Sequence, residues 1–186
     1  MFEEILSRIG ACLKKYNLPY MIIGGQAVLL YGEPRLTRDI DITLGINIDR
    51  LNDILLLAKE LSLKPISKEI ESFVKQTMVL PAIDETTGIR VNFIFSFTQY
   101  ELIAIRRARK ITIMGEEVAF ASPEDLIIHK IFAGRPRDLE DAKSVIIKNK
   151  DMDIHYIRSQ LKEFDTFSDK KDFLKVFEEI LKVLGI

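Results

Sequence analysis

The sequence predicts a mixed α/β (α+β) fold, in which a sheet with flanking helices is followed by a helical carboxy-terminal part. Up to about residue 121, short apolar or alternating segments, typical of strands, are interleaved with segments whose apolar residues recur every three or four positions, typical of amphipathic helices. From Ser122 onward only the helical pattern remains. We therefore expect an α/β core over 1–121 and a helical extension over 122–186 that packs on it as one compact unit.

The amino-terminal part is expected to alternate helices and strands. Apolar residues from Phe2 to Tyr16 fall at helical spacing and predict a first helix that ends near Pro19. Glycine, proline and charged turns mark the later boundaries. The expected elements are a strand over 20–23, a turn at Gly24 and Gly25, a helix over 26–31, a strand over 39–44, a helix over 50–63, strands over 76–84 and 89–96 joined by a turn at 85–88, a helix over 98–110, and a hairpin of 110–114 and 116–121.

The carboxy-terminal part begins with a clear helix start. Ser122 suits an N-cap, Pro123 suits the first helical position, and Glu124 and Asp125 place acids in the first turn. Four helices are expected, over 122–133, 137–149, 153–164 and 168–184.

Composition sets bounds on function. The formal charge of -1 over 186 residues gives no global positive field toward nucleic acid or an anionic membrane, so a site for a polyanion must be local. Cys12 is the only cysteine, which excludes an intramolecular disulfide. No signal-peptide pattern and no run of about 18 apolar residues is present, so we expect a cytoplasmic protein without a membrane span.

Asp39 and Asp41 are the first candidate site residues. Side chains alternate along a strand, so these two carboxylates share one face with Cα atoms roughly 6–7 Å apart. Hard divalent cations such as Mg²⁺ are held in proteins by one or two carboxylates together with substrate phosphates. The pair is therefore a candidate metal-binding and catalytic site for Mg²⁺ or Mn²⁺, with a solvated strand face as the alternative.

Gly24 and Gly25 stand at the start of the helix that precedes this pair. Glycine lets a backbone approach a phosphate closely, and a helix start leaves its amides open to an anion. Arg35 and Thr37 could contact phosphate oxygens just before the acids. Each feature alone also fits a simple turn or surface, but their combination within 18 residues, in the order strand, glycines, helix, strand, favours a nucleotide site.

These residues carry a family resemblance. The pattern Gly24-Gly25-x-Ala27 followed by Arg35-x-Thr37-x-Asp39-Ile40-Asp41 resembles the signature of minimal nucleotidyltransferases with the polymerase β-type fold, and most of all the AbiEii-type toxin nucleotidyltransferases and their uncharacterised relatives. The resemblance extends from about Tyr20 to Asp141. It implies a polymerase β-type nucleotidyltransferase core and transfer of a nucleoside monophosphate (NMP) from a nucleoside triphosphate (NTP).

A second block supports the resemblance. The segment from His129 to Asp141 looks like a further motif of those proteins, with Lys130, Ala133, Arg135, Arg137, Asp138 and Asp141 in the expected order. The implied nucleotide-binding residues here are Lys130 and Arg135, with Asp138 as an orienting partner. The alternative is a salt-bridged junction between two helices.

Asn92 departs from the family pattern. A third carboxylate is expected on a later strand that faces the acidic pair, and Asn92 occupies that position. An amide has neither the charge nor the basicity of a carboxylate. Three explanations stay open: transfer with two carboxylates and a weaker second metal, substitution by another acid (Glu69, Glu71 or Asp84), or nucleotide binding without turnover.

The resulting hypothesis is a metal-dependent nucleotidyltransferase that moves an NMP to a hydroxyl acceptor with release of pyrophosphate. The resemblance implies RNA as an acceptor to test, and the basic segment 105–110 could guide it or could complement a helix dipole. The resemblance also implies a toxin–antitoxin role with a cognate antitoxin protein. The alternative is a catalytically impaired nucleotide-binding or partner-binding protein on the same fold, because of Asn92.

Overall fold

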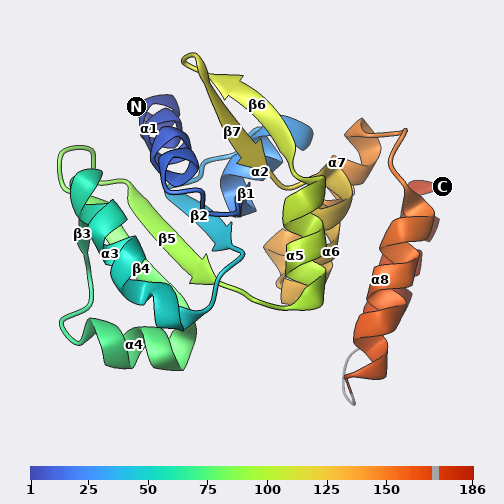
Figure 1. Cartoon of the computed structure of the whole chain (residues 1–186). Coiled ribbons are helices and arrows are strands. Elements are labelled where there is room, and N and C mark those ends of the chain that lie inside the picture. Colours follow the sequence, from blue (N-terminus) through green and yellow to red (C-terminus); the bar gives the residue numbers. More distant parts are fainter. Residues whose placement is uncertain (169–171) are drawn as a thin grey trace. The chain divides into compact units, whose positions relative to one another are not determined.

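The chain forms two units in a computed structural model that describes residues 1–168 and 172–186. The sheet unit comprises Met1–Gln26 with Leu36–Ala121, and the helical unit comprises Ala27–Arg35 with Ser122–Ile186. Helix α2 (Gly24–Tyr31) therefore begins in the sheet unit and ends in the helical unit. Figure 1 shows the elements coloured in chain order.

The sheet unit is built on one mixed sheet, whose described strands lie in the order β3-β4-β5-β2-β1-β7-β6. The strands are β1 (Tyr20–Ile23), β2 (Asp39–Leu44), β3 (Leu63–Pro65), β4 (Val79–Asp84), β5 (Arg90–Phe95), β6 (Arg109–Ile113) and β7 (Glu116–Phe120). β2 runs parallel to β5 and β1 parallel to β7, whereas the other neighbours are antiparallel. The predicted mixed α/β fold is confirmed.

Most helices in the sheet unit pack next to particular strands (Figure 1). They are α1 (Phe2–Lys15), the 3₁₀ turn η1 (Ile48–Arg50), α3 (Leu51–Glu60), α4 (Ile70–Thr77) and α5 (Gln99–Arg107). α1 packs on β7 and β6, α3 on β3, and α4 on β4. Ala104 of α5 is fully buried in a cluster with Met21 and Ala121. These helices therefore cover strands toward both ends of the sheet, and α5 covers Met21 of β1.

The structure corrects the sequence-based prediction between residues 50 and 84. The predicted helix over 50–63 ends at Glu60, and Leu63–Pro65 pairs with β4 instead. The sequence does not reveal this end, because leucines continue the helical period up to Leu63. In the structure, Ser62 marks the end of the helix with a φ of 59°. α4 is a second unpredicted element, and it takes the first two residues of the predicted strand over 76–84.

A further correction concerns the predicted helix over 98–110. α5 ends at Arg107, because Ala108 has an extended ψ of 138° and Arg109 already pairs with Phe120 across β6 and β7. The hairpin that follows turns at Met114 and Gly115, both with positive φ, as the sequence predicts for its glycine. Arg109 and Lys110 are therefore strand residues.

The helical unit contains α6 (Pro123–Ala133), α7 (Pro136–Lys148), α8 (Ile154–Thr166) and α9 (Phe173–Leu184) besides the end of α2. The first three match the predicted helices to within two residues. Within the predicted helix over 168–184, α9 begins only at Phe173 with Asp172 as its N-cap, Ser168 is not helical, and residues 169–171 lie outside the described residues. The Ser122 hydroxyl accepts from the Asp125 amide at 3.1 Å, so the predicted cap is confirmed. Among the described residues, no helix has both the length and the apolar character that a membrane span needs.

A connected set of charged side chains, called the ion network below, ties α6 and α7 to the segment after α2. Lys130 Nζ on α6 lies 2.8 Å from Asp138 Oδ1 and 2.8 Å from Asp141 Oδ2, both on α7. Arg35 binds the Asp141 carboxylate with two nitrogens, at 2.8 and 2.9 Å. Arg135 donates to Asp138. Lys130 and both aspartates are at most 6% exposed, so their charges are balanced within the unit.

Both aspartates of the ion network are ionised in spite of their burial. Burial is the largest single influence on Asp138 and raises its pKa, but hydrogen bonds from Arg135 and Lys130 together outweigh it. Burial acts in the same way on Asp141, where hydrogen bonds from Arg35 and Lys130 outweigh it. The pKa of each carboxyl group therefore lies below its ordinary value, and the stability that this contributes is lost as pH falls through the folded-state pKa.

We predict that Lys130→Met lowers the free energy of unfolding by about 3 kcal/mol, because it leaves two buried carboxylates with only one cationic partner each. Urea unfolding followed by circular dichroism measures the change. The matched control is Lys143→Met, which removes an exposed pair with Glu140 and is expected to cost less than about 0.5 kcal/mol. Equal effects of the two variants would show that the ion network contributes nothing beyond a surface pair.

Candidate active site

The two acids of the predicted site lie on the accessible face of β2. Ile40 and Ile42 are fully buried in the core of the sheet unit, whereas Asp39 and Asp41 alternate with them and are partly exposed. Alternation along the strand thus separates the apolar and acidic residues onto opposite faces. The predicted placement of both carboxylates on one face follows from this burial pattern.

The first residue of α2 lies against Asp41. Ile23 at the end of β1 pairs with Asp41, and α2 begins at the next residue, Gly24, rather than after the glycine pair as the sequence suggests. Gly24 has a φ of +64°, and a Cβ atom placed on it would overlap Asp41 Oδ2. Only glycine fits this position without displacement of the carboxylate. Gly25 follows as a buried residue in the first turn.

Asn92 lies beside Asp41 on the neighbouring strand. In the parallel ladder of β2 and β5, Asp41 pairs with Asn92 and Asp39 pairs with Arg90. Asn92 Nδ2 donates a hydrogen bond of 2.8 Å to Asp41 Oδ1. The sequence predicted that Asn92 would face the acidic pair. Only the structure shows that its amide nitrogen points toward Asp41.

Other acids do not complete a cluster with this pair. Among the described residues, no group of three or more His, Cys, Asp or Glu side chains is arranged to hold a metal ion. Asp84 Oδ1 accepts from the amides of Thr86 and Thr87 and thereby shapes the turn after β4. Substitution of the third carboxylate by Glu69, Glu71 or Asp84 therefore has no support in the described geometry.

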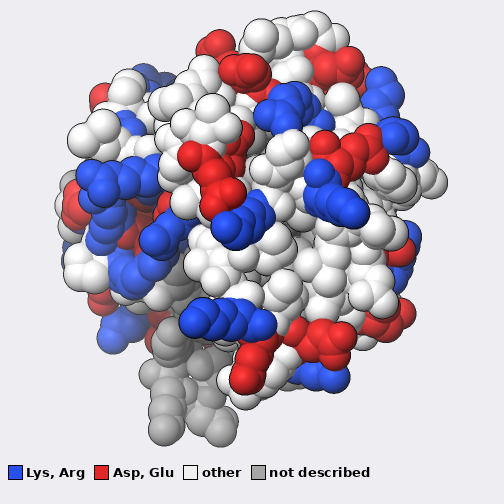
Figure 2. Space-filling model, turned by 90° about the vertical axis from the view of Figure 1, so that its left-hand side faces the viewer, with Lys and Arg blue, Asp and Glu red and all other residues white. Residues whose placement is uncertain are grey.

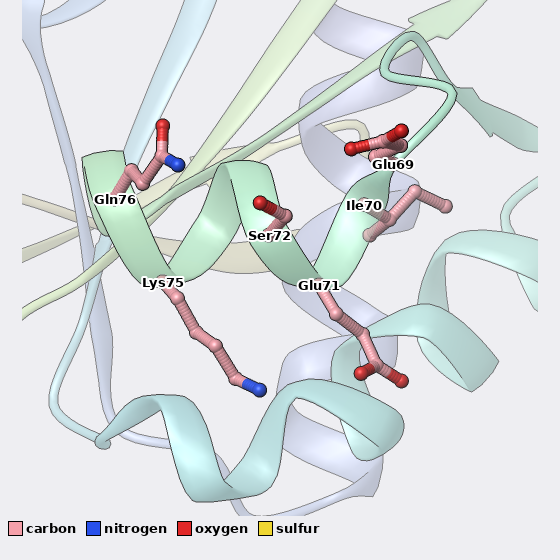
Figure 3. Close-up of a pocket in the computed structure, with 6 residues that line it drawn as sticks. All are labelled: Glu69, Ile70, Glu71, Ser72, Lys75 and Gln76. Atoms are coloured by element: carbon pink, nitrogen blue, oxygen red, sulfur yellow. The ribbon is translucent and has the colours of Figure 1, made fainter.

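Glu69 and Glu71 instead line an open groove on α4, about 640 Å³ in volume. Figure 3 shows Glu71 and Lys75 on the side of the helix that faces away from the labelled Gln76 amide. α4 ends where Met78 accepts a hydrogen bond from Phe95, at the opposite end of β5 from Arg90, the partner of Asp39. The groove is thus separate from the acidic pair along the strand direction.

The residues present fit one hard divalent cation. Asp39 and Asp41 offer carboxylate oxygens on one face of β2, and Mg²⁺ or Mn²⁺ needs only one or two such groups when substrate phosphates supply further oxygens. Asn92 presents its nitrogen to Asp41, so its nitrogen is not a ligand for such an ion. The donor set is two carboxylates.

The remaining predicted residues fall in two places. Thr37, in the sheet unit, lies near the acids, and its hydroxyl is 3.4 Å from the backbone oxygen of Asp39. Arg35, Lys130, Arg135 and Asp138 belong to the helical unit, where all four are members of the ion network. Their proposed contacts with nucleotide stay predictions.

Gln26 is a candidate that the sequence reasoning missed. It follows the two glycines in the first turn of α2 and is 5% exposed. Its Nε2 atom is buried and has no hydrogen-bond partner among the described residues. Because an unsatisfied buried donor costs about 1–3 kcal/mol, such a group next to a candidate site calls for a functional test. Its position directly after Gly25 was the available sequence signal.

Basic residues of the segment 105–110 are divided between two elements. Arg106 and Arg107 are in the last turn of α5, where cations complement the helix dipole, and Arg109 and Lys110 belong to β6. Lys110 pairs with Glu117 at 3.3 Å. On the face shown in Figure 2, blue and red side chains are interspersed, in agreement with the near-zero net charge.

Solved structures of nucleotidyltransferases are similar to this fold. A nucleotidyltransferase-like protein from Paracoccidioides brasiliensis is 16% identical with a TM-score of 0.59, and the match covers 97% of this chain and 87% of that one. ANT(2")-Ia in complex with adenylyl-2"-tobramycin is 17% identical with a TM-score of 0.59, over 88% of this chain and 97% of that one. At these identities the likeness shows the fold. Comparison with curated proteins gives no match.

A family match extends the likeness from fold to sequence. Residues 1–180 match the family described as "Nucleotidyltransferase of unknown function (DUF6036)". This range includes the glycines of α2, the acidic pair, Asn92 and the ion network. The chain therefore belongs to this nucleotidyltransferase family.

Proposed function

We propose that the protein transfers an NMP from an NTP to a hydroxyl acceptor, with release of pyrophosphate, and that the reaction depends on Mg²⁺ or Mn²⁺. The observation that carries the proposal is the acidic pair on the accessible face of β2, with the backbone of Gly24 against Asp41. A carboxylate pair beside a helix start combines a cation site with an anion site, which is what a metal-bound triphosphate requires.

The proposed roles follow from this geometry. Asp39 and Asp41 hold the divalent cation, which when bound neutralises charge on the triphosphate. Gly24 and Gly25 let the phosphates approach the amides at the start of α2. In the transfer, the acceptor oxygen bonds to the α-phosphorus while the bond to the bridging oxygen breaks, and pyrophosphate leaves with that electron pair. The hydroxyl proton passes to a carboxylate of the pair or to water, because the Asn92 amide has no basicity.

In the helical unit, we keep Lys130, Arg135, Asp138 and Arg35 as proposed nucleotide-binding or positioning residues. Arg135 is the member best suited to touch a phosphate, because its side chain is 76% exposed. The Lys130 side chain is buried and lies between two carboxylates, which favours a positioning role for it. Asp138 would act through Arg135 and Lys130.

The acceptor is proposed to be RNA, and the biological role to be that of a toxin with a cognate antitoxin. The resemblance to AbiEii-type toxins supports both proposals, and the basic residues around the end of α5 support the RNA acceptor. A small hydroxyl compound is the rival acceptor. It is favoured by the interspersed charges of Figure 2 and by the adenylyl-2"-tobramycin bound to ANT(2")-Ia.

A second candidate function is nucleotide binding without turnover. The hydrogen bond from Asn92 to Asp41 favours it, because an amide occupies the position where a third carboxylate could take part in catalysis. In this case the protein would sense a nucleotide or contact a partner. Binding and turnover therefore need separate tests.

We predict that calorimetry detects binding of at least one NTP in the presence of Mg²⁺, and that Asp39→Asn combined with Asp41→Asn lowers the affinity at least 100-fold or abolishes it, because the cation loses both charged ligands. The control is Asp49→Asn combined with Asp53→Asn, which removes two exposed acids of the same unit. Failure of every NTP to bind the folded natural protein would contradict the proposal.

We predict that Gly24→Ala reduces Mg²⁺–NTP affinity about 10-fold or more, because the added Cβ displaces the Asp41 carboxylate. Gly88→Ala is the matched control: Gly88 also has positive φ, at +72°, but no atom lies within 4 Å of an added Cβ. Both variants should lose about 1 kcal/mol of stability from backbone strain. Only Gly24→Ala should lose affinity for Mg²⁺–NTP. Equal affinities of the two variants would show that Gly24 does not belong to the nucleotide site.

We predict pyrophosphate release and label transfer when the protein is incubated with α-labelled NTP, Mg²⁺ and a mixture of transfer RNAs. Aminoglycosides and other small polyols serve as parallel acceptors. Label on RNA supports the proposal that RNA is the acceptor. Label on a small compound instead shows that the acceptor is a small hydroxyl compound. Binding of NTP with no transfer to any acceptor, in assays where a known nucleotidyltransferase is active, would select the second candidate function.

A further inference from the structure

Asn92 is the one polar side chain on β5 that touches the acidic pair in a described hydrogen bond. Its neighbours in the ladder show which other side chains could bind a cation at this site. Across the sheet, the row through Asp41 consists of Ile23, Asp41, Asn92 and Pro81, from β1 to β4. The row through Asp39 continues with Arg90 and Ile83. Neither row holds a third carboxylate.

Charge in these rows suits a single divalent cation. Two carboxylates supply a formal charge of -2, which one divalent ion balances, and the adjacent Arg90 adds a positive charge to the row of Asp39. A second ion would need further anionic oxygen ligands on the protein, since pairs of catalytic ions lie about 3.5–4 Å apart and share carboxylates. The described residues around Asp41 supply none.

The direction of the Asn92 amide adds a steric and electrostatic barrier. Its Nδ2 lies 2.8 Å from Asp41 Oδ1 and carries the positive end of the amide dipole toward the carboxylate. A cation cannot approach Asp41 from that side without breaking the hydrogen bond. At the same time the hydrogen bond restrains the Asp41 carboxylate, as partners of metal ligands commonly do.

Resting on the proposed function, we infer that Asn92 makes this a single-cation nucleotide site: its amide holds Asp41 for the ion that accompanies the triphosphate and takes the place of a second ion at the acceptor side. Asn92 is thus a positioning residue. The site retains nucleotide binding, and it lacks the second ion that would assist deprotonation of the acceptor hydroxyl. Any transfer then depends on an acceptor that loses its proton readily.

Counting bound Mn²⁺ by electron paramagnetic resonance tests this inference directly, with a readout independent of activity. The full chain is titrated with Mn²⁺ in the presence of one equivalent of a non-hydrolysable NTP analogue. The natural protein should bind one Mn²⁺ per chain, without spin coupling between ions. Asn92→Asp should bind two, with a spectrum coupled as for ions about 3.5–4 Å apart.

Two control variants separate the role of the amide from that of added charge. Asn92→Ala should still bind one Mn²⁺, with about 10-fold lower affinity, because Asp41 loses its restraint. Asn52→Asp adds a carboxylate at an exposed position of α3 in the same unit, and its count should stay at one. Circular dichroism confirms that each variant is folded.

The failures of the inference and of the proposed function are distinguishable. A coupled pair of ions in the natural protein overturns the inference while nucleotide binding stands. A count of one in folded Asn92→Asp also overturns it, because Asn92 then does not set the number of ions. Absence of any bound Mn²⁺ in the natural protein, with or without nucleotide, overturns the proposed function and this inference together.

Discussion

The position of the Asp41 carboxylate is the constraint on which the chemistry of the sheet unit depends. Burial of Ile40 and Ile42 fixes which face of β2 is apolar, and a slip of one residue would turn these isoleucines outward and the two acids into the core. The same register pairs Asp41 with Asn92 of β5 and with Ile23 of β1, and so places Gly24, the first residue of α2, against Asp41. Burial of the apolar residues of β2 therefore positions the polar site on the opposite face of the strand.

The two units use charge in opposite ways. In the helical unit, carboxylates and cations of the ion network are paired with one another and buried, which suits a structural or positioning role. In the sheet unit, the acidic pair is partly exposed, and Asp41 accepts a hydrogen bond from the neutral amide of Asn92. Carboxylates at an accessible surface can be reached by a cation and its ligand, and this contrast in burial is why the proposed metal site is assigned to β2.

Local signals predicted those parts of the structure that depend on a few consecutive residues. The cap at Ser122, the hairpin turn at Gly115 and the alternation of β2 from Asp39 to Ile42 are of this kind, and each is found as predicted. Elements whose identity depends on distant partners were missed. β3 forms where Leu63 pairs with Asp84, 21 residues away, although Leu63 itself continues the apolar period of the preceding helix.

The sequence by itself determined the fold class, the acidic pair on one strand face and the order of glycines, helix and strand, because these follow from composition and from the period of side chains along a single element. Only the tertiary structure decided what each candidate touches. That Asn92 donates to Asp41, that Gly24 lies against the same carboxylate and that Lys130 is enclosed by two aspartates are contacts between separate elements. Strand register and helix packing set such contacts, and neither is encoded in any one segment.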